Sequence, residues 1–334
     1  MSYKRFDADD VLVSVESITT SAWSGNVTTL SSFYTSSTQY NSTSGDFYVN
    51  VFNQDPSGSG EEIQFTIGYA NKNGAGTVLY NQSGNASVAG KSPSDTVYGQ
   101  YRTLILGDEE SDFVFGSGDN TYTADSFYVI SIDRARYKEK ILPGSLELTL
   151  DVGGNSIVIQ DVVTTTQTFT DAGRVYELKT SANNTVPNSG SFGKLFPDIG
   201  VILLNEEALD ASVGAGGIAL GTVNGSNNND RNPQKLFNAI VAGANFKLSS
   251  QETVSSNFVF ARARNSEFNY STNPSILTGS GELRHDVLID SPETYITTVG
   301  LYNDNRDLLA VAKLSRPLLK NSTKEALVRI KLDY

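Results

Sequence analysis

The sequence predicts a mostly-β protein built from β-sandwich-type domains, with one or two short helices and an extended N-terminal arm. Three observations support this fold class. Short runs of β-branched and aromatic residues recur along the chain, and clusters of Gly, Asn, Ser and Asp separate them. Few stretches have helical periodicity, so the chain lacks the alternation of strands and helices that a doubly wound α/β fold requires. No segment repeats at a fixed period, which argues against solenoids and propellers.

The first 45 residues are predicted to form the arm. Residues 11–45 are rich in Ser and Thr, and their larger apolar anchors, among them Trp23, Phe33 and Tyr34, are scattered. This composition fits an extended segment that lies on another surface, and it fits an irregular N-terminal region of the same domain equally well. We predict that Trp23, Phe33 and Tyr34 attach the arm to a neighbouring protein.

Two β-rich domains are expected after the arm, at residues 46–190 and 191–334. The polar, Gly- and Asn-containing stretch 181–193 marks the boundary between them. The clearest strand is 63–69, in which apolar residues alternate so that Ile63, Phe65, Ile67 and Tyr69 share one face. Further strands are expected at 47–52, 127–132, 145–150, 156–162, 175–178, 257–263, 295–302, 308–314 and 326–334.

Two segments have the signals of a helix. The clearer one lies near residues 233–242, because Asn232 can cap the first amides, Pro233 fits the first turn and Gly243 can end the helix. A shorter helix is expected at 205–209, where two acidic residues stand at the positive end of the helix dipole. The residues after 221 form a polar loop that is expected at the surface.

Composition excludes several classes of function. The 25 Lys and Arg residues against 37 Asp and Glu residues give a net charge of −12, which argues against a nucleic-acid binder. The chain has no cysteine, so disulfides, thiolate metal sites and cysteine nucleophiles are excluded. No apolar run is long enough for a membrane span, and the first residues lack the apolar stretch of a signal peptide. We therefore expect neither nucleic acid nor membrane among the partners.

Residues for catalysis are also scarce. The lone histidine, His285, is expected at the surface. The chain has no Gly-x-Ser-x-Gly elbow, so the Ser-His-Asp arrangement fails for lack of an oriented base, and a single histidine cannot form a histidine metal cluster. Adjacent acids such as Glu61-Glu62 and Glu206-Glu207 would point to opposite faces of a strand, so neither pair is by itself a glycosidase dyad. The oxygen-rich stretch 303–307 lacks the glycine and glutamate of an EF-hand loop and fits a hairpin turn better. We expect no enzymatic activity, no cofactor and no metal.

The densest basic segment carries Arg134, Arg136, Lys138 and Lys140 at alternate positions. An extended backbone would place all four cations on one face. One hypothesis is a docking strip for an acidic neighbour, such as the acidic front of a second copy. The alternative is a solvated loop, whose exposed ion pairs contribute under about 1 kcal/mol each.

The carboxyl end carries a resemblance to a known family. Residues 294–314, ITTVGLYNDNRDLLAVA at their centre, resemble a hairpin found in tail and baseplate proteins of tailed bacteriophages. The pattern is an apolar strand, a polar turn and a returning apolar strand, and Arg306 stands where a turn glycine is common. Residues 127–140 and 196–205 look like segments of virion proteins of large contractile-tailed phages, particularly T4-like phages of marine cyanobacteria.

This resemblance implies a non-enzymatic structural protein of the virion, in the tail or baseplate. Such a protein is synthesised in the host cytoplasm and assembles with other virion proteins in symmetric copies. A capsid or neck decoration protein is the alternative within this class. Two further alternatives lie outside this class. One is a host-binding adhesin, with exposed tyrosines at 98–101 and 122, and the other is a glycan-degrading tail protein. The hairpin 295–314 is expected to pack within its domain, and the alternating strand 326–334 is expected to bury one face.

Overall fold

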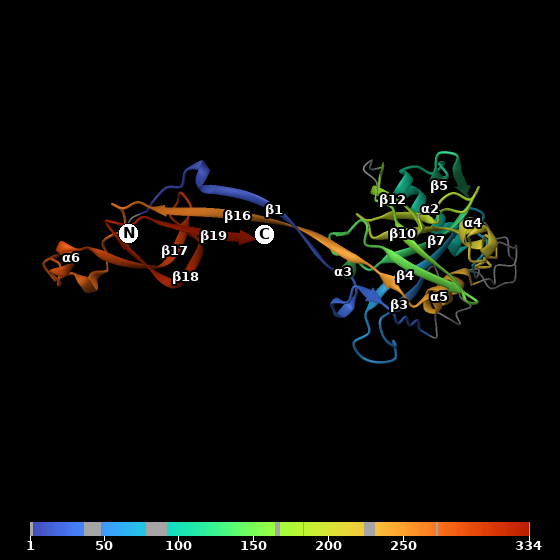
Figure 1. Ribbon diagram of the computed structural model, residues 1–334, viewed down its shortest axis with the longest axis horizontal. Helices are drawn as coiled ribbons and strands as arrows, with labels where there is room; N and C mark the ends of the chain where they lie inside the picture. The colour runs from blue at the N-terminus through green and yellow to red at the C-terminus, as the bar shows by residue number, and fades with distance from the viewer. Residues whose placement is uncertain are drawn as a thin grey trace. The chain divides into compact units, whose positions relative to one another are not determined.

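The computed structural model shows a mostly-β protein, as the sequence predicts (Figure 1). The chain divides into two compact units: unit 1 comprises Met1–Ser17 and Thr253–Tyr334, and unit 2 comprises Ile18–Glu252. The structure describes residues 3–36, 48–77, 92–163, 168–182, 184–223, 231–271 and 273–333.

Unit 2 is built on one large antiparallel sheet. Some neighbours in the sheet are consecutive in sequence, whereas others, such as β14 and β7, are far apart along the chain, and β11 (Thr168–Thr170) adds to the side of β12. A separate hairpin joins β5 (Phe113–Ser117) and β6 (Asn120–Ala124). The strand order is β2 (Thr29–Leu30), β15 (Phe246–Lys247), β9 (Glu147–Val152), β10 (Asn155–Asp161), β12 (Gly173–Thr180), β13 (Gly193–Phe196), β14 (Val201–Asn205), β7 (Ser126–Ile132), β4 (Ile63–Asn71) and β3 (Tyr48–Phe52).

Both faces of this sheet are covered by the chain itself. Along β7, Tyr128 and Ile130 belong to a core that includes α5 (Asn232–Gly243), whereas Phe127 and Val129 belong to a second core that includes α2 (Pro93–Leu106). Figure 1 shows α2 and α5 on the two sides of the strands. Because successive strand residues point to opposite faces, a helix on each side leaves the central strands buried throughout.

The sheet curves until its two ends meet. Phe65 of β4 and Phe246 of β15 come from opposite parts of the strand order, yet their ring centroids lie 5.2 Å apart. Trp23 lies against both rings, with centroid distances of 5.9 Å to Phe65 and 4.8 Å to Phe246. Such edge-to-face aromatic contacts are favourable in a core. The ends of the sheet therefore close over one hydrophobic core, as in a sandwich.

The helices match the sequence in part. The helix expected near 233–242 is α5, and the one expected at 205–209 is α4 (Glu206–Asp210), whose first amides Asn205 caps. The structure adds α3 (Arg134–Tyr137) and α6 (Val287–Asp290), and it adds α2, which is the longest helix of the described residues. The β-rich reading missed α2.

The domain boundary expected near residue 190 lies inside unit 2. β12 and β13 pair across it, with Leu178 opposite Gly193. Gly190 takes a positive φ of 72°, and a Cβ at this position would lie 2.3 Å from the carbonyl oxygen of Phe115. A stretch rich in Gly and Asn is thus part of a tight packing contact between β5 and the sheet, and the chain does not change units there.

Polar contacts join neighbouring parts of unit 2. Asp198, in the turn before β14, forms an ion pair with the guanidinium of Arg174 on β12 and also accepts a hydrogen bond of 2.9 Å from the backbone amide of Arg174. Burial would raise the pKa of Asp198, but the hydrogen bonds and charge of Arg174 outweigh burial and hold the pKa below its usual range.

Unit 1 consists of two small antiparallel sheets. One has the order β1 (Val11–Ser21), β16 (Ser249–Ala263) and β19 (Ala326–Asp333), and β8 (Lys140–Ile141) pairs with the first residues of β16 within unit 2. The other is the hairpin of β17 (Glu293–Tyr302) and β18 (Leu308–Asn321). Val259, Leu301 and Ile330 form a small core between them. The hairpin and the alternating last strand that the sequence predicts are both confirmed.

Two local features stabilise unit 1. In the hairpin turn, Arg306 takes a positive φ of 70°, the conformation for which a glycine is usual, and Asp307 donates its amide to the side chain of Asn303 at 2.7 Å. Lys320 on β18 is fully buried, and its ammonium donates hydrogen bonds to the carbonyl oxygens of Asn265 and Asn321 and to the side-chain oxygen of Asn269.

Candidate functional site

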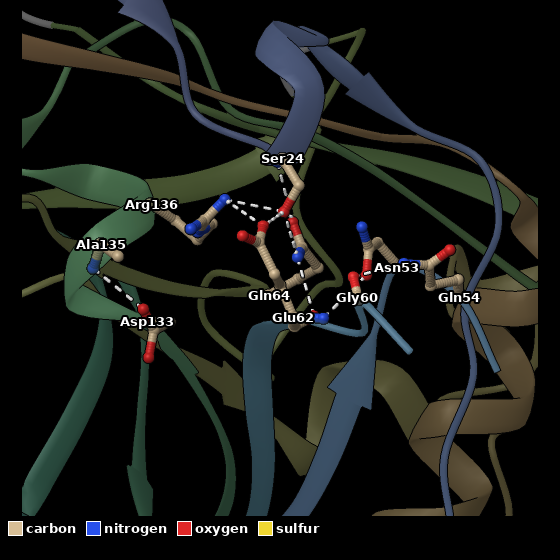
Figure 2. A network of polar contacts seen from close by, with 9 residues as sticks. All are labelled: Ser24, Asn53, Gln54, Gly60, Glu62, Gln64, Asp133, Ala135 and Arg136. Carbon is tan, nitrogen blue, oxygen red and sulfur yellow. Dashed lines mark hydrogen bonds and ion pairs between the residues drawn. The ribbon is translucent and has the colours of Figure 1, made fainter. Parts of the chain in front are cut away.

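The basic segment around Arg136 lies in a polar network within unit 2 (Figure 2). Arg136 Nη1 donates to Ser24 Oγ at 2.7 Å and forms an ion pair of 3.1 Å with Glu62 Oε2. The buried side chain of Gln64 donates to Ser24 Oγ at 2.6 Å and accepts a hydrogen bond from the Ser24 amide at 3.1 Å. The network joins the segment after β1, the start of β4 and α3.

Asp133 places Arg136 in this network. The Asp133 side chain accepts a hydrogen bond of 2.9 Å from the amide of Ala135 and so caps α3, while its own amide donates to the Gln64 carbonyl at 3.0 Å. The hydroxyl of Ser24 and the charge of Arg136 hold the pKa of Glu62 below its usual range. The arrangement stabilises charges and positions the backbone of the segments that it joins.

The other three cations also contact their own chain. The guanidinium of Arg134 lies 4.9 Å from the ring centroid of Tyr137, Lys138 forms an ion pair of 2.7 Å with Glu252, and Lys140 lies 3.5 Å from a carboxylate oxygen of its neighbour in sequence. The segment turns through α3 and a positive φ at Lys138, so the cations do not form the single extended face that alternate spacing suggests. The single extended face that the docking hypothesis assumed is absent, and docking of an acidic neighbour on these residues stays a prediction.

The predicted aromatic anchors lie in different places. Trp23 is buried, and its indole N–H donates to the carbonyl of Phe246 at 2.7 Å. Phe33 is buried with its ring 6.2 Å from that of Phe65, whereas Tyr34 is 42% exposed. Trp23 and Phe33 are therefore core residues of unit 2 rather than the free face of an arm. Residues 37–47, the rest of the expected arm, lie outside the described residues together with most of the loop after 223.

A pocket of about 280 Å³ opens where β4 and β7 meet the start of α4. The tyrosine Tyr69 donates to Glu206 Oε2 at 2.7 Å beside it. Desolvation, together with the nearby carboxylate charge, raises the pKa of Tyr69 well above its usual value, and the pKa of Tyr122 is raised for the same reasons. Both phenols therefore stay protonated near neutral pH. The pocket is lined by Asn71, Asn73, Ala75, Tyr122, Asp125, Ser126, Glu206 and Glu207.

This pocket is acidic, because Asp125, Glu206 and Glu207 line it. Within the described ranges, no three His, Asp or Glu side chains are arranged to hold a metal ion. His285 is exposed in unit 1, close to α6. Tyr98 and Tyr101, the tyrosines expected on an adhesive loop, lie on α2 and are buried, so that expectation is wrong for both.

Exposed apolar side chains gather on unit 1. It holds less than a third of the chain, yet it contributes 17 of the 26 exposed large hydrophobic side chains of the described residues. They include Val13 and Val15 of β1 and Leu309 and Val311 of β18, all more than half exposed. This concentration of exposed apolar side chains marks unit 1 as a candidate interaction surface.

Sequence reasoning missed this surface, although a signal for it is present. Nearly every position is apolar in the run Val11-Leu12-Val13-Ser14-Val15. A strand with apolar residues on both faces cannot bury all of them against a single layer. The structure places this run at the end of a sheet, and no helix of the described part of unit 1 covers it.

Comparisons with known proteins identify no relative of this chain: no family model matches it, and neither the curated proteins nor the solved structures contain a significant match. No helix among the described residues has the length and apolar character needed to cross a membrane.

Proposed function

We propose that this protein is a structural component of a tailed-phage virion, in the tail or baseplate, and that it acts through protein–protein assembly rather than catalysis. The observation that carries the proposal is the apolar surface of unit 1. Its described part buries few hydrophobic side chains, chiefly Val259, Leu301 and Ile330, and leaves many more in contact with water. A permanent assembly would bury this surface.

The resemblance of residues 294–314 to a phage tail hairpin points in the same direction, because that segment lies in the β17–β18 hairpin, which carries several of the exposed apolar side chains. The adhesin alternative is weakened, since two of the tyrosines on which it depended are core residues. A capsid or neck position remains compatible with an assembly role and is an outcome of the test below.

The test is mass spectrometry of purified particles of the phage that encodes the chain, with labelled antibody to locate the protein on intact particles. We expect the protein in stoichiometric amounts and label at the tail or baseplate. Label at the head or neck would move the protein to the decoration class. Absence from washed particles, or turnover of host polysaccharide by the purified protein, would overturn the proposal.

A further inference from the structure

We propose that unit 1 binds a second copy of this chain, with the outer face of the β17–β18 hairpin of one copy against the valine row Val11, Val13 and Val15 of the next. This inference rests on the proposed function, because it names the partner that an assembly protein would meet first. Two apolar faces of different shape, present on the same unit, are what the proposal requires.

The outer face of the hairpin follows from the alternation of its strands. Ala310 and Ala312 of β18 pack against the core of unit 1, so Leu309 and Val311 between them point away from it. Leu309 is 67% exposed and Val311 57%. These side chains have no apolar cover from the described part of unit 1.

Gly300 makes this face continuous. It stands directly opposite Val311, and a Cβ on Gly300 would lie 2.9 Å from the ring of Tyr302 and 3.2 Å from Leu308. The side chains of Tyr302 and Leu308 therefore lean over the glycine and fill the space that a side chain would take. The result is an apolar patch of Tyr302, Leu308, Leu309 and Val311, which we call the hairpin patch.

The valine row lies on the sheet face that carries the core of unit 1. Glu16 forms an ion pair of 3.8 Å with Lys331, and Lys331 points away from the core because its neighbour Ile330 is buried in it. Since Glu16 shares its face with Lys331, the adjacent Val15, and with it Val13, faces the core side. The two valines are nevertheless 65% and 60% exposed.

The core of unit 1 is therefore incomplete at one end. Its apolar face continues from β19 and β16 onto β1, the last strand of the order, where the hairpin of the same chain no longer covers it. An apolar hairpin from outside would complete this layer in the same way as the chain's own hairpin completes the rest. A long apolar edge strand left open would also invite uncontrolled pairing.

The charge distribution favours a second copy as the partner. Unit 1 has 12 basic and 13 acidic residues, a net charge of −1, whereas unit 2 has 13 basic and 24 acidic residues, a net charge of −11. Contact between the nearly neutral units 1 of two copies meets little charge repulsion, whereas contact between their acidic units 2 is opposed by it. A basic partner would be attracted to unit 2 instead.

The first experiment measures the association of the full chain by sedimentation velocity over a concentration series. We expect an oligomer, and we expect it to be weakened about tenfold or more by Leu309→Thr/Val311→Thr and by Val13→Thr/Val15→Thr, because threonine is suited to a β-strand but places a hydroxyl in the apolar contact. Val114→Thr is the matched control, since Val114 is 41% exposed on the β5–β6 hairpin of unit 2. Circular dichroism confirms that each variant is folded.

The second experiment uses the absence of cysteine in the chain. When a Val13→Cys variant and a Val311→Cys variant are mixed and oxidised, we expect a disulfide between the two copies. A mixture of Val114→Cys and Val311→Cys is the control, and we expect no disulfide between copies in it. A monomer at all concentrations, or an oligomer that neither double substitution weakens, overturns the inference. If the protein is a monomer but is present in virions, this inference is refuted and the proposed function stands. If the protein is an oligomer but is absent from particles, the proposed function is refuted and this inference stands.

Discussion

Replacement of Trp23 by alanine tests whether the N-terminal segment belongs to the core of unit 2 or waits for a neighbouring protein. Trp23 is buried between Phe65 and Phe246, and its N–H is bonded to a backbone carbonyl. Truncation of a core tryptophan costs about 3–5 kcal/mol, and the carbonyl that loses its donor adds about 1 kcal/mol or more. At about 2–4 °C per kcal/mol for a unit of this size, the melting temperature should fall by about 10 °C or more.

The assay is denaturant unfolding of the isolated protein followed by far-ultraviolet circular dichroism. Trp23→Phe should give an intermediate loss, because it keeps a ring and removes the hydrogen bond. Tyr34→Ala is the control, and because Tyr34 is largely exposed its effect should stay within about 0.5 kcal/mol. Trp23 is the only tryptophan, so wild-type fluorescence reports on this position alone. Equal unfolding midpoints for Trp23→Ala and Tyr34→Ala would refute the reasoning and restore the free arm.

Three further predictions concern other parts of the fold. Lys320→Met should destabilise unit 1 by about 1–3 kcal/mol and speed hydrogen exchange at 265–269, because three oxygens lose their hydrogen-bond donor. Lys313→Met is the control on the same strand, and because Lys313 is exposed it should have neither effect. Gly190→Ala should destabilise unit 2 more than Gly118→Ala, since both glycines have positive φ but only Gly190 is crowded; equal losses in thermal melts would exclude the clash. Asp198→Asn should cost about 1 kcal/mol at neutral pH. The depressed pKa of Asp198 contributes stability above its unfolded value of 3.8, so this difference should vanish as pH falls through the folded pKa, and a pH-independent difference in acid titrations would contradict it.

Alternation of apolar and polar residues predicted the strands well where burial of one strand face sets the sequence pattern. Phe65, Ile67 and Tyr69 share the core that includes α5, as expected for β4. The sequence did not reveal that the other face of β4 is buried too. That face is covered by α2, whose residues Val97, Tyr98, Tyr101 and Ile105 follow a helical spacing between a proline at the first turn and Gly107 at the end. Tyrosines in this helix suggested exposure, and tertiary packing decided otherwise.

Contacts between distant residues could not be predicted from spacing. Trp23 meets Phe246, and Ser24 meets Arg136, across more than a hundred residues of sequence. Nothing local distinguishes an aromatic residue that docks on its own chain from one that docks on a partner, and the same holds for a cation beside a distant carboxylate. Trp23, Phe33 and the four basic residues all contact other residues of their own chain.

The two units differ in what covers their sheets, and this difference gives the assembly proposal its physical basis. In unit 2, helices of the same chain cover both faces, so even Trp23 and Phe33 are buried. In the described part of unit 1 the longest helix is the four-residue α6, and a single hairpin covers only part of one sheet face. Antiparallel sheets gain stability from burial of at least one face. Unit 1 contains no further element among its described residues to supply that cover. In the proposed assembly the hairpin patch of a second copy supplies it, because the exposed side chains of that patch are apolar.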